Sequence, residues 1–139
     1  MEVTANALQT VEANQNVLFT DTVVCGSYSI LHREGSGLIT LRGLTNQCRA
    51  RFKATFGGNV AIPADGTVGP ITLALALNGE AVGSTTMIQT PAAVSQFHNV
   101  SSSIFLDVPA NCCVQLSVTN LTEDAIEIQN ANLIVERVA

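Results

Sequence analysis

Arg49-Ala50-Arg51-Phe52-Lys53-Ala54-Thr55-Phe56 is the stretch of this sequence that decides the fold. Its even-numbered residues are apolar, and its odd-numbered residues are polar, three of them cationic. An alternation with a period of two is typical of a β-strand that is buried on one side only. The stretch therefore predicts a strand with one apolar and one basic face, and Gly57-Gly58 is expected to end it.

Further strands are expected on both sides of this stretch. Residues 71–77 alternate large and small apolar side chains and run into Asn78-Gly79, the strongest short signal of a hairpin. Near the end of the chain Leu133 is out of phase with Ile128, so a bulge is expected at residues 130–132. Besides 49–56, the expected strands span approximately residues 16–20, 28–32, 38–41, 71–77, 80–86, 97–108, 114–119 and 125–138.

The spacing of these strands indicates the fold class. No segment has a convincing helical repeat of apolar residues over ten positions, and the one weak candidate is 4–14. Roughly eight to ten short strands at regular spacing favour an antiparallel sandwich or barrel. The sequence contains no linker, repeat or low-complexity tract, so its 139 residues are expected to form one all-β domain.

The composition excludes several classes of protein. Charged residues make up 12% and hydrophobic residues 47%, with a formal net charge of -5. These values do not suit a disordered chain, and the acidic balance does not suit a nucleic-acid binder. No apolar run approaches the roughly 18 residues of a membrane helix, and residues 1–6 lack the features of a signal peptide. We therefore expect no nucleic acid and no membrane among the partners, and apolar surface covered by a large core or a subunit interface.

The four cysteines are Cys25, Cys48, Cys112 and Cys113. Their spacing matches no zinc motif, because the last two are adjacent rather than separated by two residues. In the absence of an export signal, the preferred interpretation is reduced and mostly buried thiols. A disulfide between Cys25 and Cys48 is the alternative, and a zinc site is the least favoured interpretation.

Several segments occur in an order that is typical of one family. A short strand ends at His32, a Gly-Ser-Gly turn follows at 35–37, and an alternating strand comes next. Later an aliphatic strand runs through Asn-Gly into its return strand, another strand ends at Val108-Pro109, and a strand pair closes the chain. This set resembles the bacterial and phage domains of the C1q/TNF-like jelly-roll class. The similar segments are 27–41, 73–82, 105–110, 118–120 and 128–135.

The resemblance implies a ten-strand TNF/C1q-like jelly roll that assembles as a homotrimer. It sets residues 17–139 apart as the jelly-roll domain and leaves residues 1–16 as an N-terminal arm that could add to a neighbour's sheet. The low charge agrees with a trimer, because the core of a subunit interface is depleted of charged residues. The collagen-like Gly-X-Y stalk that often precedes such domains is absent from this sequence.

Arg49, Arg51 and Lys53 are half of the six cationic residues and lie on one face of one strand. Like charges at this spacing repel, so a carboxylate partner is expected nearby. The first interpretation is a set of cross-strand or trimer-interface ion pairs, with Glu127 and Gln129 of the last strand as neighbours. The resemblance places these strands in one sheet close to the threefold axis. A solvated face and an anion or phosphate site are the other interpretations.

The two histidines, His32 and His98, belong to no catalytic motif. G-x-S-x-G, H-E-x-x-H and the P-loop are all missing from the sequence, and Cys48 with either histidine is only part of a triad. His98 is expected as a hydrogen-bonded core or interface histidine, and His32 as a subunit contact or a metal ligand on the trimer axis. No catalytic residue, metal site or cofactor is predicted, and we do not expect an enzyme.

The predicted function is therefore structural. It is a homotrimeric jelly roll of a phage virion, acting as a head decoration protein, a fibre head or a tail accessory protein. Its partners would be its own copies and other virion or surface proteins. The alternative is a C1q/TNF-like adhesion domain on a bacterial cell or spore surface, which the missing Gly-X-Y tract disfavours. A sugar-binding or enzymatic jelly roll is a third class, disfavoured because lectins often use exposed aromatic residues and this chain has one tyrosine and no tryptophan.

Overall fold

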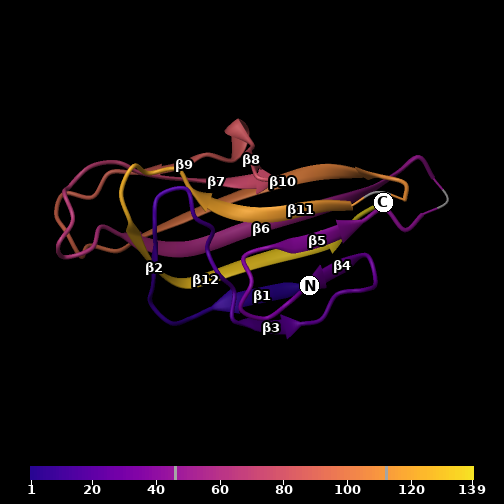
Figure 1. Cartoon of the computed structure of the whole chain (residues 1–139), viewed down its shortest axis with the longest axis horizontal. Coiled ribbons are helices and arrows are strands. Elements are labelled where there is room, and N and C mark those ends of the chain that lie inside the picture. Colours follow the sequence, from indigo (N-terminus) through magenta and orange to yellow (C-terminus); the bar gives the residue numbers. More distant parts are fainter. Residues whose placement is uncertain (46, 112) are drawn as a thin grey trace.

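The protein is an all-β sandwich of two sheets. A computed structural model describes residues 1–45, 47–111 and 113–139. All paired strands in it run antiparallel to each other. The long strands of both sheets follow the long axis of the molecule (Figure 1). The predicted fold class, an antiparallel β-sandwich, is confirmed.

Each of the two sheets has a main path of five strands and one short strand outside it. The first has the order β10-β6-β12-β1-β3, and the short strand β2 adds to β12. The second has the order β4-β5-β11-β7-β8, and β9 adds to β7. The five strands in the main path of each sheet together make the ten strands expected of the jelly roll, and β2 and β9 are short strands outside these paths. In chain order the strands are β1 (Glu2–Ala5), β2 (Gln9–Val11), β3 (Asp21–Val24), β4 (Ile30–His32), β5 (Ile39–Arg42), β6 (Arg49–Ala61), β7 (Ile71–Leu77), β8 (Glu80–Ala81), β9 (Met87–Gln89), β10 (His98–Pro109), β11 (Cys113–Asn120) and β12 (Ile126–Arg137).

Strand β6 is longer than its alternating stretch predicts. It continues through Gly57 and Gly58 to Ala61, because β10 and β12 still pair with it on both sides there. Gly58 faces the interior, where a Cβ atom would approach the Phe56 ring to 3.3 Å. The glycine pair therefore fits a close approach inside a central strand and does not end it.

Two local predictions are confirmed. The register of β12 against β6 shifts between Gln129 and Asn132, and Asn130 has a φ of 55°, so a bulge lies where the change of phase predicts it. Asn78 and Gly79 join β7 to β8 with φ angles of 53° and 83°. Positive φ at both central residues is the geometry of the type I′ turn that Asn-Gly favours.

Residues 1–16 form part of the sandwich. Strand β1 lies between β12 and β3, and β2 pairs with the first residues of β12. Val3, Ala5 and Val11 are buried in the common core. The weak helical pattern at 4–14 is not realised, because alternation over the first five residues gives β1 a buried side in a sheet. The segment predicted as a separate arm is therefore placed inside the domain.

Two predicted strands are much shorter than expected. The segment 16–20 contributes only an isolated bridge between Asn16 and Thr119. The strand after Gly79 ends at Ala81, and a 3-10 turn, Gly83–Thr85, follows. The Thr85 hydroxyl accepts a hydrogen bond from the backbone N–H of Leu75 at 2.9 Å. The Thr85 side chain thus takes the place of a backbone partner for Leu75 at the edge of β7.

The core lies between the two sheets. Phe19, Phe52 and Phe56 are all 0% exposed, and Phe19 meets Phe56 edge to face with ring centroids 6.5 Å apart. Burial of a large apolar side chain contributes about 2 kcal/mol. The inward side chains of β6 are therefore needed for the core, whereas its outward side chains can contribute to a functional surface.

Candidate functional site

The outward side of the first sheet carries the predicted ion-pair residues and is termed the outer face. Its rows follow from the cross-strand register, because directly opposed residues point to the same side of a sheet. One central row runs across β10, β6, β12 and β1, and a second row lies beside it. The first row is Ser103, Thr55, Ile134 and Glu2, and the second is Ser101, Gly57, Asn132 and Thr4.

The centre of the outer face is polar, small and weakly charged. Glu2 is the one charged residue of the two rows, and it accepts a hydrogen bond from the Asn132 amide at 3.3 Å. Ile134 is 40% exposed in the middle of the face. Small uncharged side chains with an exposed aliphatic residue leave little to oppose contact with another flat surface.

Charged groups gather at the end of the outer face where β6 begins. The Arg51 guanidinium donates to both carboxylate oxygens of Asp107 on β10, at 2.8 and 3.1 Å. Arg49 Nε lies 3.4 Å from the same carboxylate. The hydrogen bond from Arg51 lowers the pKa of Asp107, and the same bond together with the Asp107 charge raises the pKa of Arg51. The expected carboxylate partner is therefore present, and it is Asp107.

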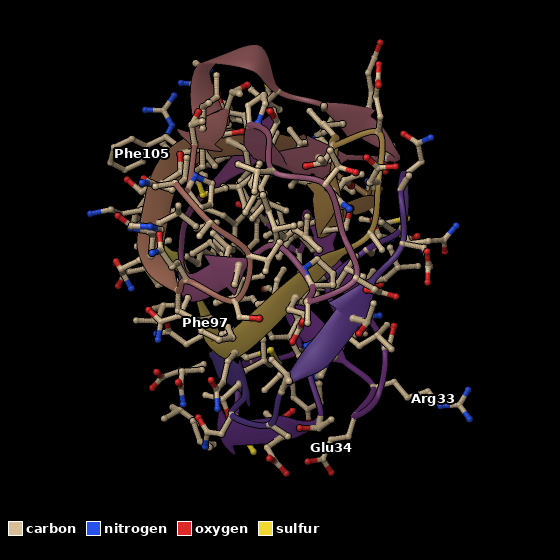
Figure 2. The ribbon with its side chains drawn as sticks, turned by 90° about the vertical axis from the view of Figure 1, so that its left-hand side faces the viewer. Arg33, Glu34, Phe97 and Phe105 are labelled. Atoms are coloured by element: carbon tan, nitrogen blue, oxygen red, sulfur yellow. The ribbon has the colours of Figure 1, made fainter. Side chains whose placement is uncertain are left out.

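Lys53 and Phe105 occupy the next row. The Lys53 ammonium lies 5.7 Å from the centre of the Phe105 ring, within the range of a cation–π contact. The ring is 62% exposed, and it points away from the body of the molecule (Figure 2). Glu136 of β12 lies opposite Lys53 on the other side of β6. The row thus combines a cation, a carboxylate and an exposed aromatic ring.

Glu127 and Gln129, predicted as neighbours of the basic stripe, lie at the other end of the sheet. Glu127 is opposite Ala61 and Gln129 is opposite Asn59. Strands β6 and β12 are antiparallel, so the start of β12 meets the end of β6. At roughly 3.3 Å per residue, Gln129 and Glu127 lie about 26 and 33 Å along the strands from Arg51. Residues 97–108 were expected as a strand, but the pairing that sets Asp107 opposite Arg51 was not predicted.

Asparagine side chains dominate the end of the outer face where β6 finishes. The Asn99 amide donates to the side-chain oxygen of Asn59 at 3.2 Å. Asn59 in turn donates to the side-chain oxygen of Asn130 at 3.3 Å. This amide chain connects β10, β6 and the bulge of β12 without any charge.

The described cysteines differ from the prediction of buried thiols. Cys25, Cys48 and Cys113 are free and exposed, so the alternative bridge between Cys25 and Cys48 is not formed. All three lie in or next to connecting segments, where side chains are exposed more often than in strand interiors. Cys112 lies outside the described residues.

Both ring nitrogens of His32 are engaged. Nε2 lies 3.0 Å from the Ser36 carbonyl, which can only accept, so this nitrogen carries the hydrogen. Nδ1 lies 3.0 Å from the Thr22 hydroxyl and accepts from it. His98 differs from its prediction, because its buried Nε2 has no hydrogen-bond partner among the described residues.

Over residues 1–45, 47–111 and 113–139, no three His, Cys, Asp or Glu side chains gather as a metal site would require. In the same part of the chain, no helix has the length and apolar character needed to cross a membrane.

No family model and no curated protein matches the sequence. Among solved structures, the globular domain of zebrafish complement 1qA protein is similar, with a TM-score of 0.64 and 12% identity over 96% of this chain and 93% of that chain. The chain therefore has the jelly-roll fold of the C1q globular domain.

Two other structures overlay less well, and they add nothing to this assignment. The C-terminal domain of EclA, described as a sugar-binding protein, has a TM-score of 0.43 and 15% identity over 95% of this chain and 80% of that chain. The CBM35 of Cellvibrio japonicus Abf62 has a TM-score of 0.42 and 8% identity over 100% and 98%.

Proposed function

We propose that this chain is a non-enzymatic structural domain that assembles as a homotrimer through its outer face. The observation that carries the proposal is the outer face itself, with weakly charged central rows between an ion-pair end and an amide end. Ile134 and Phe105 are exposed on it at 40% and 62%. Exposed apolar side chains among small polar neighbours are typical of a surface that another subunit covers.

The size of the outer face supports this proposal. Strands are about 4.8 Å apart and rise about 3.3 Å per residue, so β10, β6 and β12 together present roughly 600 Å². Strands β1 and β3 extend this towards the ~800 Å² per partner that a specific interface buries. The exposed valines of β3, Val23 and Val24, are 57% and 54% exposed and continue the apolar surface to that edge.

The substitution Thr55→Arg tests the homotrimer. Thr55 lies at the centre of the outer face, between Ser103 and Ile134, so a guanidinium there would be desolvated against the next subunit. We expect the wild-type protein to sediment as a trimer at micromolar concentration and the variant as a monomer. A monomeric wild type would overturn the proposal.

Thr40→Arg is the matched control for this experiment. Thr40 lies on the outward side of the second sheet, between Leu31 and Gln115, and is partly buried like Thr55. The two variants have the same change of size and charge on a central strand position. The control should retain the trimer, and equal loss of assembly in both would mean that the second sheet contributes as much as the first.

We place this trimer in a phage virion, as a head decoration protein, fibre head or tail accessory protein. Support comes from the resemblance of the sequence to the bacterial and phage domains of the C1q/TNF-like class. The alternative is an adhesion domain on a bacterial cell or spore surface. Neighbouring genes test this choice, because capsid, portal or tail genes would favour the virion and sporulation genes would favour the spore.

A further inference from the structure

One long side of the molecule has an open cavity between the edges of the two sheets. It has a volume of about 830 Å³ and lies between β3 and β4, with Thr22, Ile30 and His32 among its lining residues. Neither edge strand is covered by a further strand there, because β3 and β4 end their sheets. The outer face and this cavity are separate parts of the surface.

Tyr28 is presented at this cavity on a fixed turn. It is the one tyrosine of the chain, and at 82% it is the most exposed of the large apolar side chains described. Arg42 holds the turn by donating to the Tyr28 carbonyl from Nε and Nη2, at 3.0 and 2.8 Å. The next residue, Ser29, is buried, and its carbonyl accepts from the Arg42 backbone N–H at 2.8 Å. The ring is therefore displayed by a pre-organised backbone.

Polar groups with fixed orientations line the same cavity. One Glu34 oxygen accepts a hydrogen bond from the backbone N–H of Thr22 at 3.1 Å, which orients the carboxylate, and its other oxygen has no hydrogen-bond partner among the described residues. The Thr22 hydroxyl is held by His32 Nδ1 at 3.0 Å. Figure 2 shows Glu34 beside Arg33 at the lower edge of the molecule. The cavity thus combines an exposed aromatic ring with an oriented carboxylate.

We propose that this cavity binds a neutral sugar ring. A pyranose has an apolar face of C–H groups that packs on an aromatic ring, and a rim of hydroxyl groups that donate to a carboxylate. Tyr28 and Leu31, which is 41% exposed, supply the apolar side, and Glu34 supplies the acceptor. Glu34 is the one charged side chain among the lining residues, and the ammonium of Met1 is bonded to the Val135 carbonyl, so the charge offered to a ligand is that of Glu34 and favours a neutral over an anionic sugar. This inference goes beyond the structural role and is independent of the oligomeric state.

Intrinsic fluorescence tests the sugar site directly. Because the chain has one tyrosine and no tryptophan, tyrosine emission reports on Tyr28 alone. The probes are methyl β-D-glucopyranoside, methyl β-D-galactopyranoside and methyl α-D-mannopyranoside, with glucuronic acid as the anionic comparison. We expect a saturable change in emission with at least one methyl glycoside, and weaker binding of glucuronic acid. No change with any of the three glycosides would overturn the proposal.

Variants locate the binding by saturation-transfer NMR on the same glycosides. Tyr28→Ala should abolish transfer to the sugar, Tyr28→Phe should retain it, and Glu34→Gln should weaken binding about tenfold through loss of a charge-assisted hydrogen bond. Phe97→Ala removes another exposed aromatic ring, at 42%, and should leave binding of the glycosides unchanged. Transfer that persists in Tyr28→Ala would overturn the proposal. Sedimentation of each variant keeps this result separate from the trimer.

Discussion

The two ends of the outer face achieve cross-strand contact by different means. Where β6 begins, Arg51 and Asp107 form a two-pronged ion pair at 2.8 and 3.1 Å. Where β6 finishes, Asn99, Asn59 and Asn130 form a chain of neutral amides at 3.2 and 3.3 Å. At the end where β6 begins, an ion pair joins β6 to β10, and Glu136 of β12 lies opposite Lys53. At the other end, neutral amides connect β10, β6 and β12.

The comparison shows that the two ends of one sheet should respond differently to salt and to pH. An exposed ion pair is screened by salt and lost when its carboxylate is protonated. Amide hydrogen bonds carry no net charge, so neither salt nor moderate acid removes them. The ion-pair end should therefore respond to solution conditions that leave the amide end unchanged.

The largest effect on stability is expected on the inner side of β6, because the core packing there holds the strand that carries both ends of the outer face. Phe56→Ala removes a fully buried ring that packs on Phe19. We expect a loss of about 3–5 kcal/mol in the free energy of unfolding, measured by chemical denaturation. Thr55→Ala, one residue away on the outer face, is the control and should cost far less. Similar losses for the two variants would contradict the assignment of inner and outer sides.

An intermediate effect is expected at the amide end. Asn59→Ala removes the central member of the amide chain and breaks both of its bonds, at a cost of about 1–2 kcal/mol. Asn99→Ala breaks only one bond and should cost about half as much. Thermal melts at low and high salt should show the same loss for each variant. If the Asn59 variant lost no more than the Asn99 variant, the three amides would not act as a chain.

The smallest effect is expected at the ion-pair end, because Asp107 and its partners are exposed. The pKa of Asp107 is lowered by its bond to Arg51, so its stabilising contribution is present above the ordinary carboxyl pKa and disappears as the pH falls through the lowered value. Asp107→Asn should lower the melting temperature slightly at neutral pH and low salt. The difference from wild type should shrink at high salt and vanish in strong acid. A difference independent of both would argue that packing, not charge, is lost.

Alternation along residues 49–56 of β6 was enough to predict which of its residues face the core and which face outward. A period of two is a local property, and it is preserved wherever a sheet has one buried side. The partner of the basic stripe was not predictable in this way. Arg51 meets Asp107 because β6 pairs with β10 in one register, and residues 56 positions apart carry no local sign of that pairing.

The N-terminal strand and the exposed tyrosine were missed for different reasons. Strand β1 has only four residues, so the alternation of its two buried side chains, Val3 and Ala5, is too short to outweigh the weak helical pattern at 4–14. Tyr28 was predicted within a strand, yet it lies in a turn held by Arg42 from β5. Whether Tyr28 is exposed depends on this contact between residues distant in the chain, and the sequence alone does not reveal it.

The position of β1 also has a consequence for how the chain reaches its folded state. Strand β1 lies between β12 and β3, so one of its partners follows soon after it in the chain and the other lies about 130 residues further on. At roughly 5–20 residues per second, β1 waits for several seconds before Ile134 is available to pair with Glu2. The pairing of β1 with β12 therefore forms only after residue 134 has been synthesised, and sheets built from such distant pairings fold slowly. During that interval Val3 and Ala5, which are buried in the folded core, lack the neighbours that β12 provides, and exposed apolar side chains of this kind favour aggregation.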